Sequence, residues 1–292
     1  LPNAKQVHGG AMGYNNFVDG EAALSSVLEH KDRIAVSIIK HSNPCGLATG
    51  DSLEEAFERA WQGDPVSAFG SVIALTRPLD LATAKLIENR FVEVIAAPSI
   101  DADALEFIQG LGKKKAGLRL LEYGELPDDA PSPVSRRAIS GGLLEQERDD
   151  LYYLCDSPDA LFQEATEMTC PNSGKSLAVG IATKSKPSAG RAGLVDFALR
   201  HLKHVKSNAI VVAREYEDGK YQALGMGCGQ PNRKDSVALC GARAVDNLRL
   251  EYFASLGSNG TRDEYLDGLA ETDRGKYLAA EEDYVKEQLA GE

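Results

Sequence analysis

The sequence lacks the features that would assign it to a membrane, secreted or nucleic-acid-binding class. Its most apolar stretch, residues 34–39, is far shorter than the ~20 apolar residues of a membrane-spanning helix. No basic, apolar and small-residue series opens the chain, so no secretory signal is predicted. Lysine and arginine number 32 against 44 acidic residues, a net charge of −12, which disfavours broad phosphate-backbone binding. We therefore expect a cytoplasmic protein that binds neither membranes nor nucleic acid.

Cysteines are few and scattered. The five are Cys45, Cys155, Cys170, Cys228 and Cys240. An odd number without any C-x-x-C pair fits a reducing compartment better than a disulfide framework. The sequence also contains no H-x-E, which a zinc-dependent deaminase requires together with its two cysteines. The sequence therefore predicts no catalytic metal.

What is present is an alternation of helical and strand patterns. The 292 residues, 43% of them hydrophobic, are enough for about two domains. Helices are predicted over 21–30, 51–61 and 81–89, and β-type runs over 34–39, 71–75 and 91–97. In the second half, a helix over 191–204 is followed by a strand over 208–213, a turn at 217–219, a glycine-broken strand and a helix over 235–245. This alternation predicts an α/β layered fold with a largely parallel sheet.

A proline-rich run divides the chain. Residues 124–133 contain three prolines and no apolar period, which is typical of a linker. We therefore expect a first subdomain over 1–124, a linker over 125–134, a second subdomain over 135–250 and an acidic helical tail over 251–292.

The first candidate site follows the strand at 34–39. Lys40 and His41 stand there, and ligand sites in open α/β sheets lie at strand ends. Histidine supplies a base near neutral pH and the ammonium a donor for developing negative charge. Side chains of adjacent strand residues face opposite ways, so a shared task requires a bend at Lys40, which Asn43-Pro44 and Gly46 would supply. The alternative is a solvated lysine and a capping histidine in a tight turn.

Three further clusters are ambiguous by themselves. The loop 63–70 is rich in small residues that let backbone N–H groups approach a ligand, or it is an ordinary helix-to-strand connection. Asn208 either orients a polar ligand or caps a turn. Arg233, after the glycine-rich run 225–229, has the fork that grips an anion. His201 and His204 stand three apart on a predicted helix, where we expect a polar face rather than a metal site.

Taken together, several segments resemble one family in their order and in their amino-acid sequence. They are His8-Gly9 with Tyr14-Asn15-Asn16 and Asp19, then 40–46, 63–70, 91–98, 113–115, 141–146, 203–210, and Gly229-Gln230 with Arg233. They resemble the AICAR transformylase region of the bifunctional AICAR transformylase/IMP cyclohydrolase family, over about residues 6 to 245.

The resemblance implies a reaction and roles for residues. The family transfers the formyl group of 10-formyltetrahydrofolate to the 5-amine of AICAR, giving FAICAR in IMP biosynthesis. His41 matches the general base and Lys40 the residue that assists the transition state. Nucleotide contacts match Asn208, Gly70, Phe69 and Glu93, the last of which is an aspartate in some relatives. Folate contacts match Arg233 and Gln230, and no metal takes part.

The resemblance also implies two cytidine-deaminase-like three-layer subdomains without zinc, and a homodimer with shared sites. Relatives carry a segment upstream of this sequence that helps to hold the nucleotide, and a further segment downstream, so we expect the 292 residues to be a fragment with weak activity of its own. Two rival functions stay open. One is a non-catalytic nucleotide-binding or assembly module, and the other is a zinc-free nucleotide hydrolase that uses Glu93 or Asp64 opposite His41.

Overall fold

The architecture was taken from a computed structural model. It describes residues 3–125, 134–148, 152–155, 157–171, 173–181, 183–186, 188, 190–258 and 260–290. The predicted linker falls almost wholly in 126–133, outside the described residues. No helix within the described part of the chain is long and apolar enough to cross a bilayer.

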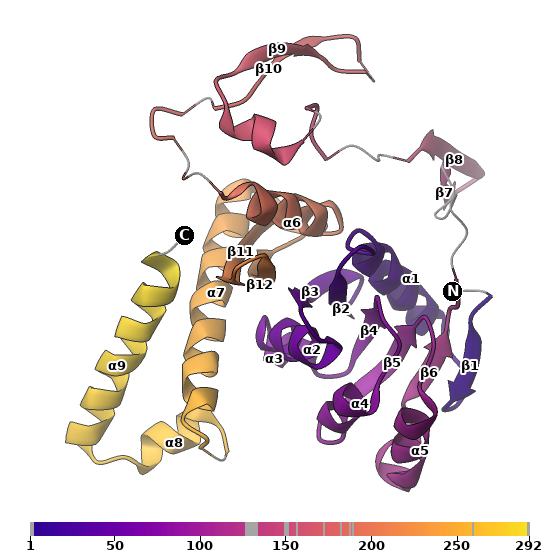
Figure 1. The fold of residues 1–292 in the computed structure, drawn as a ribbon, viewed down its shortest axis with the longest axis vertical. Helices are drawn as coiled ribbons and strands as arrows, with labels where there is room; N and C mark the ends of the chain where they lie inside the picture. The colour runs from indigo at the N-terminus through magenta and orange to yellow at the C-terminus, as the bar shows by residue number, and fades with distance from the viewer. Residues whose placement is uncertain are drawn as a thin grey trace.

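A mixed sheet with helices on both faces forms the centre of the described chain (Figure 1). Its eight strands lie in the order β1-β6-β5-β4-β2-β3-β12-β11. They are β1 (Lys5–His8), β2 (Ile34–Lys40), β3 (Asn43–Gly50), β4 (Ser71–Leu75), β5 (Val92–Ala97), β6 (Arg119–Glu122), β11 (Ile210–Glu217) and β12 (Lys220–Gly227). The predicted α/β class is confirmed.

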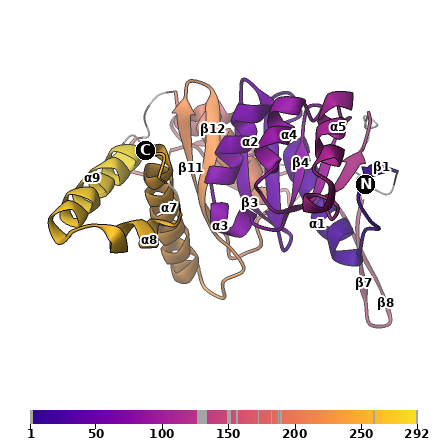
Figure 2. The ribbon, with the colours of Figure 1, turned by 90° about the horizontal axis from the view of Figure 1, so that it is seen from below.

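Helices cover both faces of this sheet, and alternate residues of each strand pack against the helices of opposite faces (Figure 2). On β2, Ala35 and Ile39 point toward helix α1 (Tyr14–Leu28), whereas Val36 and Ile38 point toward the opposite face. That opposite face is covered by α2 (Leu53–Gln62), α4 (Leu81–Ile87) and α5 (Ala102–Gly110), with the short α3 (Pro65–Ala68) and η1 (Gly112–Lys114) between strands. A three-layer core results.

The second half of the chain extends the same sheet. Strand β12 lies beside β3, where Gln222 pairs with Ala48, and β11 forms the outer edge. Helix α6 (Ala192–Lys203) packs on one face of these strands and α7 (Arg233–Ser255) on the other. Helices α8 (Arg262–Gly268) and α9 (Glu271–Ala290) follow, and α9 packs against α7.

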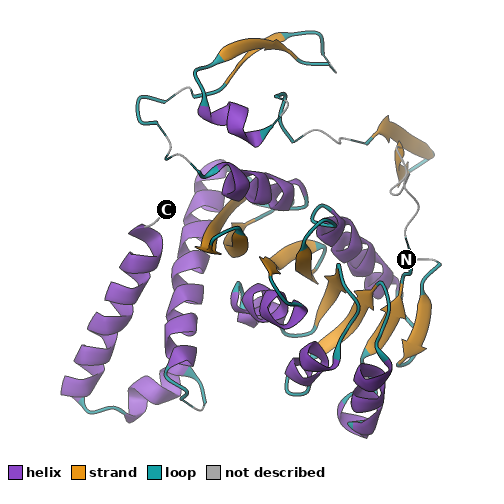
Figure 3. Ribbon diagram, in the orientation of Figure 1, coloured by secondary structure: helices purple, strands orange, loops and turns teal. Residues whose placement is uncertain are grey.

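Two small hairpins stand apart from the central sheet (Figure 3). One pairs β7 (Val134–Ile139) with β8 (Gly142–Glu147), and the other pairs β9 (Thr166–Thr169) with β10 (Ser176–Val179); η2 (Pro158–Phe162) lies between them in sequence. These segments were not predicted as strands, because their sequences lack the apolar face of a core strand. In the structure their side chains are mostly exposed.

The prediction of a largely parallel sheet was wrong. Among the described strands of this sheet, only β4 with β5 and β5 with β6 pair in parallel, and these are the strands joined by the helical crossovers α4 and α5. The remaining described pairings in this sheet are antiparallel. The source of the error is β3, a strand formed by residues that were interpreted as a bend.

Gly46 explains why that segment was misread. It lies inside β3 under helix α2, and a Cβ at this position would collide with the carbonyl oxygen of Ala60. The glycine therefore permits close packing of a helix on a strand, rather than a turn.

Candidate functional site

The candidate site begins at the tight hairpin between β2 and β3. Lys40, the last residue of β2, pairs with Asn43 across a two-residue turn. His41 and Ser42 occupy the turn with φ values of 53° and 60°, in the left-handed region. The chain therefore bends at His41–Ser42, one residue later than the sequence predicted. This bend turns the side chains of Lys40 and His41 toward one cavity.

A cavity of about 330 Å³ receives both side chains. Its walls come from α1, from the β2–β3 turn and from the adjacent ends of β4 and β5. They are Asn15, Asn16, Val18, Asp19, Lys40, His41, Ser42, Gly70, Val72 and Glu93. Four predicted site residues thus meet here, although 52 residues separate Lys40 from Glu93 along the chain, counting the residues between them.

Lys40 is held by the loop that precedes β4. Its Nζ donates to the carbonyl oxygens of Phe69 at 2.9 Å and Gly70 at 2.7 Å. Gly70 has a φ of 67°, and its N–H donates to Phe91 O at 2.8 Å. A Cβ on Gly70 would lie 3.1 Å from Lys40 Nζ and 3.1 Å from the Phe91 ring, so glycine meets both a conformational and a steric requirement.

Phe69 lies next to the cavity but is not among its lining residues. Its ring packs against Phe91 with centroids 5.1 Å apart, and the two rings are 63% and 50% exposed. The residue contributes its carbonyl oxygen to Lys40 and leaves an aromatic surface open to solvent beside the site.

Two carboxylates lie in the cavity wall. Glu93, on β5, accepts a hydrogen bond from Asn16 Nδ2 at 2.9 Å. Asp19, on α1, accepts from the Ser42 backbone N–H at 2.8 Å and from the Ser42 hydroxyl at 3.1 Å. Asp64, the other candidate for opposing His41, is not a lining residue: it caps α3 through Ser67 N–H at 2.9 Å and pairs with Arg243 at 3.3 Å.

The second half of the chain reaches the hairpin through Lys206. Its Nζ donates to His41 O at 3.3 Å, and its backbone N–H donates to the side-chain oxygen of Asn43 at 3.3 Å. This contact joins residues that are 165 positions apart and places the 206–208 segment beside the catalytic candidates.

Asn208 contacts Gln230, one of the two predicted folate residues. Asn208 donates to Gln230 O from its backbone N–H at 3.2 Å and from Nδ2 at 2.9 Å, while Ser236 Oγ donates to Asn208 O at 2.9 Å. Arg233 is exposed at the first turn of α7. None of Asn208, Gln230 and Arg233 lines the cavity, so their placement with His41 stays a prediction.

His201, in α6, and His204, which caps its C-terminus, differ from the expected polar face. His204 contacts Glu29 at 3.0 Å, but His201 is 1% exposed and neither of its ring nitrogens has a hydrogen-bond partner. Burial, together with the charge of His204, lowers the pKa of His201 to about 3. Among the described residues, no group of three or more His, Cys, Asp or Glu side chains is arranged to hold a metal ion.

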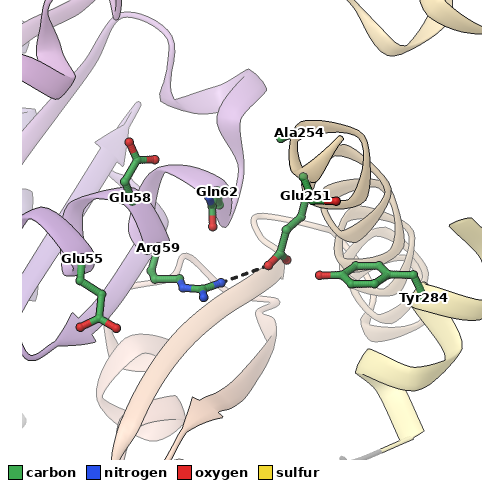
Figure 4. A pocket seen from close by; sticks show the side chains of 8 residues that line it. Glu55, Glu58, Arg59, Gln62, Glu251, Ala254 and Tyr284 are labelled. Carbon is green, nitrogen blue, oxygen red and sulfur yellow. Dashed lines mark hydrogen bonds and ion pairs between the residues drawn. The ribbon is translucent and has the colours of Figure 1, made fainter. Parts of the chain in front are cut away.

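A second cavity, of about 400 Å³, has a structural explanation (Figure 4). It lies between α2 and the helices α7 and α9 and is lined by Glu55, Glu58, Arg59, Gln62, Glu251, Ala254, Ser255 and Tyr284. Its charges are paired: Arg59 contacts Glu251 at 3.1 Å, Lys220 contacts Glu55 at 3.0 Å and Arg90 contacts Glu58 at 2.7 Å. The Arg59–Glu251 and Lys220–Glu55 pairs connect the two halves of the chain, whereas Arg90–Glu58 lies within the first half.

Sequence reasoning assigned no role to Val18 or Val72, and quoted Asn15, Asn16, Asp19 and Ser42 only as matching positions. Their convergence depends on α1 lying across the ends of β2, β4 and β5. The apolar period of α1 was a usable signal for a buried helix, but no spacing in the sequence indicates which strand ends its first turns reach.

Comparison with known proteins finds similar sequences. The family described as "AICARFT/IMPCHase bienzyme" matches residues 1–243. The chain is 39% identical over 245 residues to "Bifunctional purine biosynthesis protein PurH" of Lactobacillus acidophilus, covering 84% of this chain and 42% of that protein. The proteins of the same name from Halalkalibacterium halodurans and Parvibaculum lavamentivorans are 40% and 39% identical over 254 and 248 residues, covering 85% and 84% of this chain and 43% and 41% of theirs. The chain thus spans about two-fifths of the length of these relatives. It belongs to the AICARFT/IMPCHase bienzyme family.

Proposed function

We propose that this chain is the AICAR formyltransferase part of a bifunctional purine-biosynthesis enzyme. Its substrates would be AICAR and 10-formyltetrahydrofolate, and its products FAICAR and tetrahydrofolate. The observation that supports this most is the meeting of Lys40, His41, Gly70 and Glu93 in one cavity of a chain whose family match covers residues 1–243.

The chemistry of the substrate amine explains the need for a base. The 5-amine of AICAR is conjugated with the ring and carboxamide, so it is a poor nucleophile. His41 is an exposed imidazole at the cavity wall, able to take the amine proton as the nitrogen attacks the formyl carbon. A positioned base of this kind contributes roughly 10²–10⁴-fold to the rate.

Lys40 suits the charge that develops during this attack. As the new C–N bond forms, the formyl oxygen becomes negative, until the bond to N10 of the folate breaks and N10 receives a proton. The Lys40 ammonium has three N–H donors, and the carbonyls of Phe69 and Gly70 accept from it. These contacts fix the ammonium and leave a donor for the oxygen, a preorganised charge that needs no rearrangement.

Glu93, Asn208, Gly70 and Phe69 are proposed as nucleotide contacts; Gly70 lines the cavity and Phe69 lies next to it. Glu93 already accepts from Asn16, which orients its carboxylate within the cavity. Gln230, which follows the glycine-rich run, and Arg233, the first residue of α7, are proposed to contact the folate. An arginine fork suits the glutamate carboxylates of a folate.

The family relationship also supports finer proposals on architecture and assembly. We propose that 1–124 and 135–250 correspond to two cytidine-deaminase-like subdomains, followed by an acidic tail over 251–292. We propose a cytoplasmic homodimer in which sites are shared between subunits. The three-layer arrangement of α1, the central sheet and α2, α4 and α5 is consistent with the first of these subdomains.

The test is AICAR-dependent production of tetrahydrofolate by the full-length protein from 10-formyltetrahydrofolate. We expect turnover with AICAR and none with IMP, which lacks the attacking amine. Binding of AICAR without turnover would indicate the non-catalytic module, and consumption of the nucleotide without folate would indicate the hydrolase. Either result would overturn the proposal.

A further inference from the structure

The turn that carries His41 has a conformation that its residues do not favour by themselves. Two-residue hairpin turns with both φ values positive normally contain asparagine, aspartate or glycine. Here the two positions are His41 and Ser42, with φ of 53° and 60°. Contacts from outside the hairpin therefore contribute to the stability of this conformation.

Asp19 supplies the contacts that do so from the α1 side. One carboxylate oxygen, Oδ1, accepts from both the backbone N–H and the hydroxyl of Ser42, at 2.8 Å and 3.1 Å. Hydrogen bonds to an ionised acceptor are stronger than those between neutral groups. The backbone N–H of Ser42 is thereby fixed by a carboxylate.

The helix that carries Asp19 is itself packed against the sheet. Ala23, Leu24 and Val27 of α1 are at most 4% exposed and pack against β2, β4 and β5. From the other side, Asn43 Nδ2 and Lys206 Nζ donate to His41 O at 3.0 Å and 3.3 Å. The turn is thus held between α1 and the second half of the chain.

We infer that Asp19 is a positioning residue, which fixes the His41–Ser42 turn and through it the direction of the His41 imidazole. The inference rests on the proposed function, in which His41 is the base. A catalytic group displaced by about 1 Å loses roughly a hundredfold in rate. Asp19 would therefore control turnover through His41, without taking the proton itself.

The experiment compares Asp19→Ala with Asp19→Asn in the full-length enzyme. The asparagine side-chain oxygen still accepts from Ser42, whereas alanine removes the acceptor. We expect Asp19→Ala to lower kcat by about a hundredfold with KM for AICAR changed less than about threefold, and Asp19→Asn to retain kcat within about fivefold. The matched control is Glu21→Ala on the same helix, whose carboxylate accepts from Ser25 at 3.5 Å and which should keep parental kcat.

The double variant separates positioning from direct action. With His41→Ala already present, Asp19→Ala should lower kcat by less than about twofold, because residues that act as a unit are not additive. A further loss of tenfold or more, or a rise in KM of similar size, would show that Asp19 contacts the substrate directly and would overturn the inference.

A second measurement does not depend on turnover. In the ¹⁵N-histidine NMR spectrum, the His41 signals, identified by their loss in His41→Ala, should shift in Asp19→Ala and remain in place in Asp19→Asn. Unchanged His41 signals in folded Asp19→Ala would overturn the inference even if the parent protein transfers formyl groups. An inactive parent whose His41 signals shift as expected would instead refute the proposed function and leave the positioning role supported.

Discussion

Lys40 Nζ lies 2.7 Å from the carbonyl oxygen of Gly70, which is 30 positions further along the chain. This hydrogen bond joins the end of β2 to the residue that precedes β4, and the two strands are antiparallel neighbours. It orients the ammonium into the cavity and requires the left-handed backbone that Gly70 adopts, with a φ of 67°.

Replacing Gly70 should disturb Lys40. In Gly70→Ala, the new Cβ would lie 3.1 Å from Lys40 Nζ, and alanine disfavours this φ by about 1 kcal/mol. We expect turnover to fall by about tenfold and the melting temperature to fall by about 2 °C, measured by steady-state kinetics and thermal denaturation. Gly110→Ala is the control, because a Cβ there has nothing within 4 Å; equal effects of both substitutions would contradict the explanation.

Removing the imidazole should affect the chemical step more than nucleotide binding. For His41→Ala we expect kcat to fall by 10²-fold or more, since a proton acceptor acts in the transition state. Calorimetry should show AICAR binding within about threefold of the parent, because Glu93 and Gly70 remain in the cavity wall. Near-parental turnover would show that His41 is not the base.

Two lysines near the hairpin should differ in importance. Lys40→Met removes the ammonium that lines the cavity, and loss of one such donor costs roughly 10²–10³-fold in kcat. Lys206→Met removes a contact to the backbone oxygen of His41 on the outside of the turn, so a loss of less than about tenfold is expected. Both kcat values should be measured in variants whose melting temperatures are recorded, and a larger loss for Lys206→Met would reverse the assignment.

The buried histidines should make stability depend on pH. Burial lowers the pKa of His201 to about 3, and burial together with Arg200 and His201 lowers that of His30 to about 3, against about 6.5 in the unfolded chain. Between these values the unfolded state binds more protons, so stability is full above about pH 6.5 and falls toward pH 3. The unfolding equilibrium shifts by up to roughly tenfold per pH unit for each histidine.

Urea titrations at pH 7.5 and 5 measure this effect. The urea midpoint should be lower at pH 5 than at pH 7.5 in the parent. The decrease should be smaller in His201→Leu, because leucine at position 201 does not titrate. A comparison of pH 7.5 with 8.5 is the control, because both histidines are neutral at both values. An equal pH dependence in the parent and in His201→Leu would contradict the role given to His201.

The sequence by itself determined the chemistry available and much of the local structure. The short β-branched run at 34–39 and the cap at Ser52, which accepts from Glu55 N–H at 3.1 Å, specify β2 and α2 through local propensity alone. The helix predicted over 235–245 is likewise present but longer, since α7 runs from Arg233 to Ser255. Lys40 and His41 could be predicted to share one site because the two residues are adjacent in sequence.

The tertiary structure decided what these residues contact. Residues 43–50 have no apolar period that marks a strand, and they become β3 because β2 and β12 pair with them and α2 covers them. The Asp19–Ser42 and Lys206–His41 contacts cross 23 and 165 positions. Such contacts depend on how helices and strands pack, which the periodicity of a single segment does not encode.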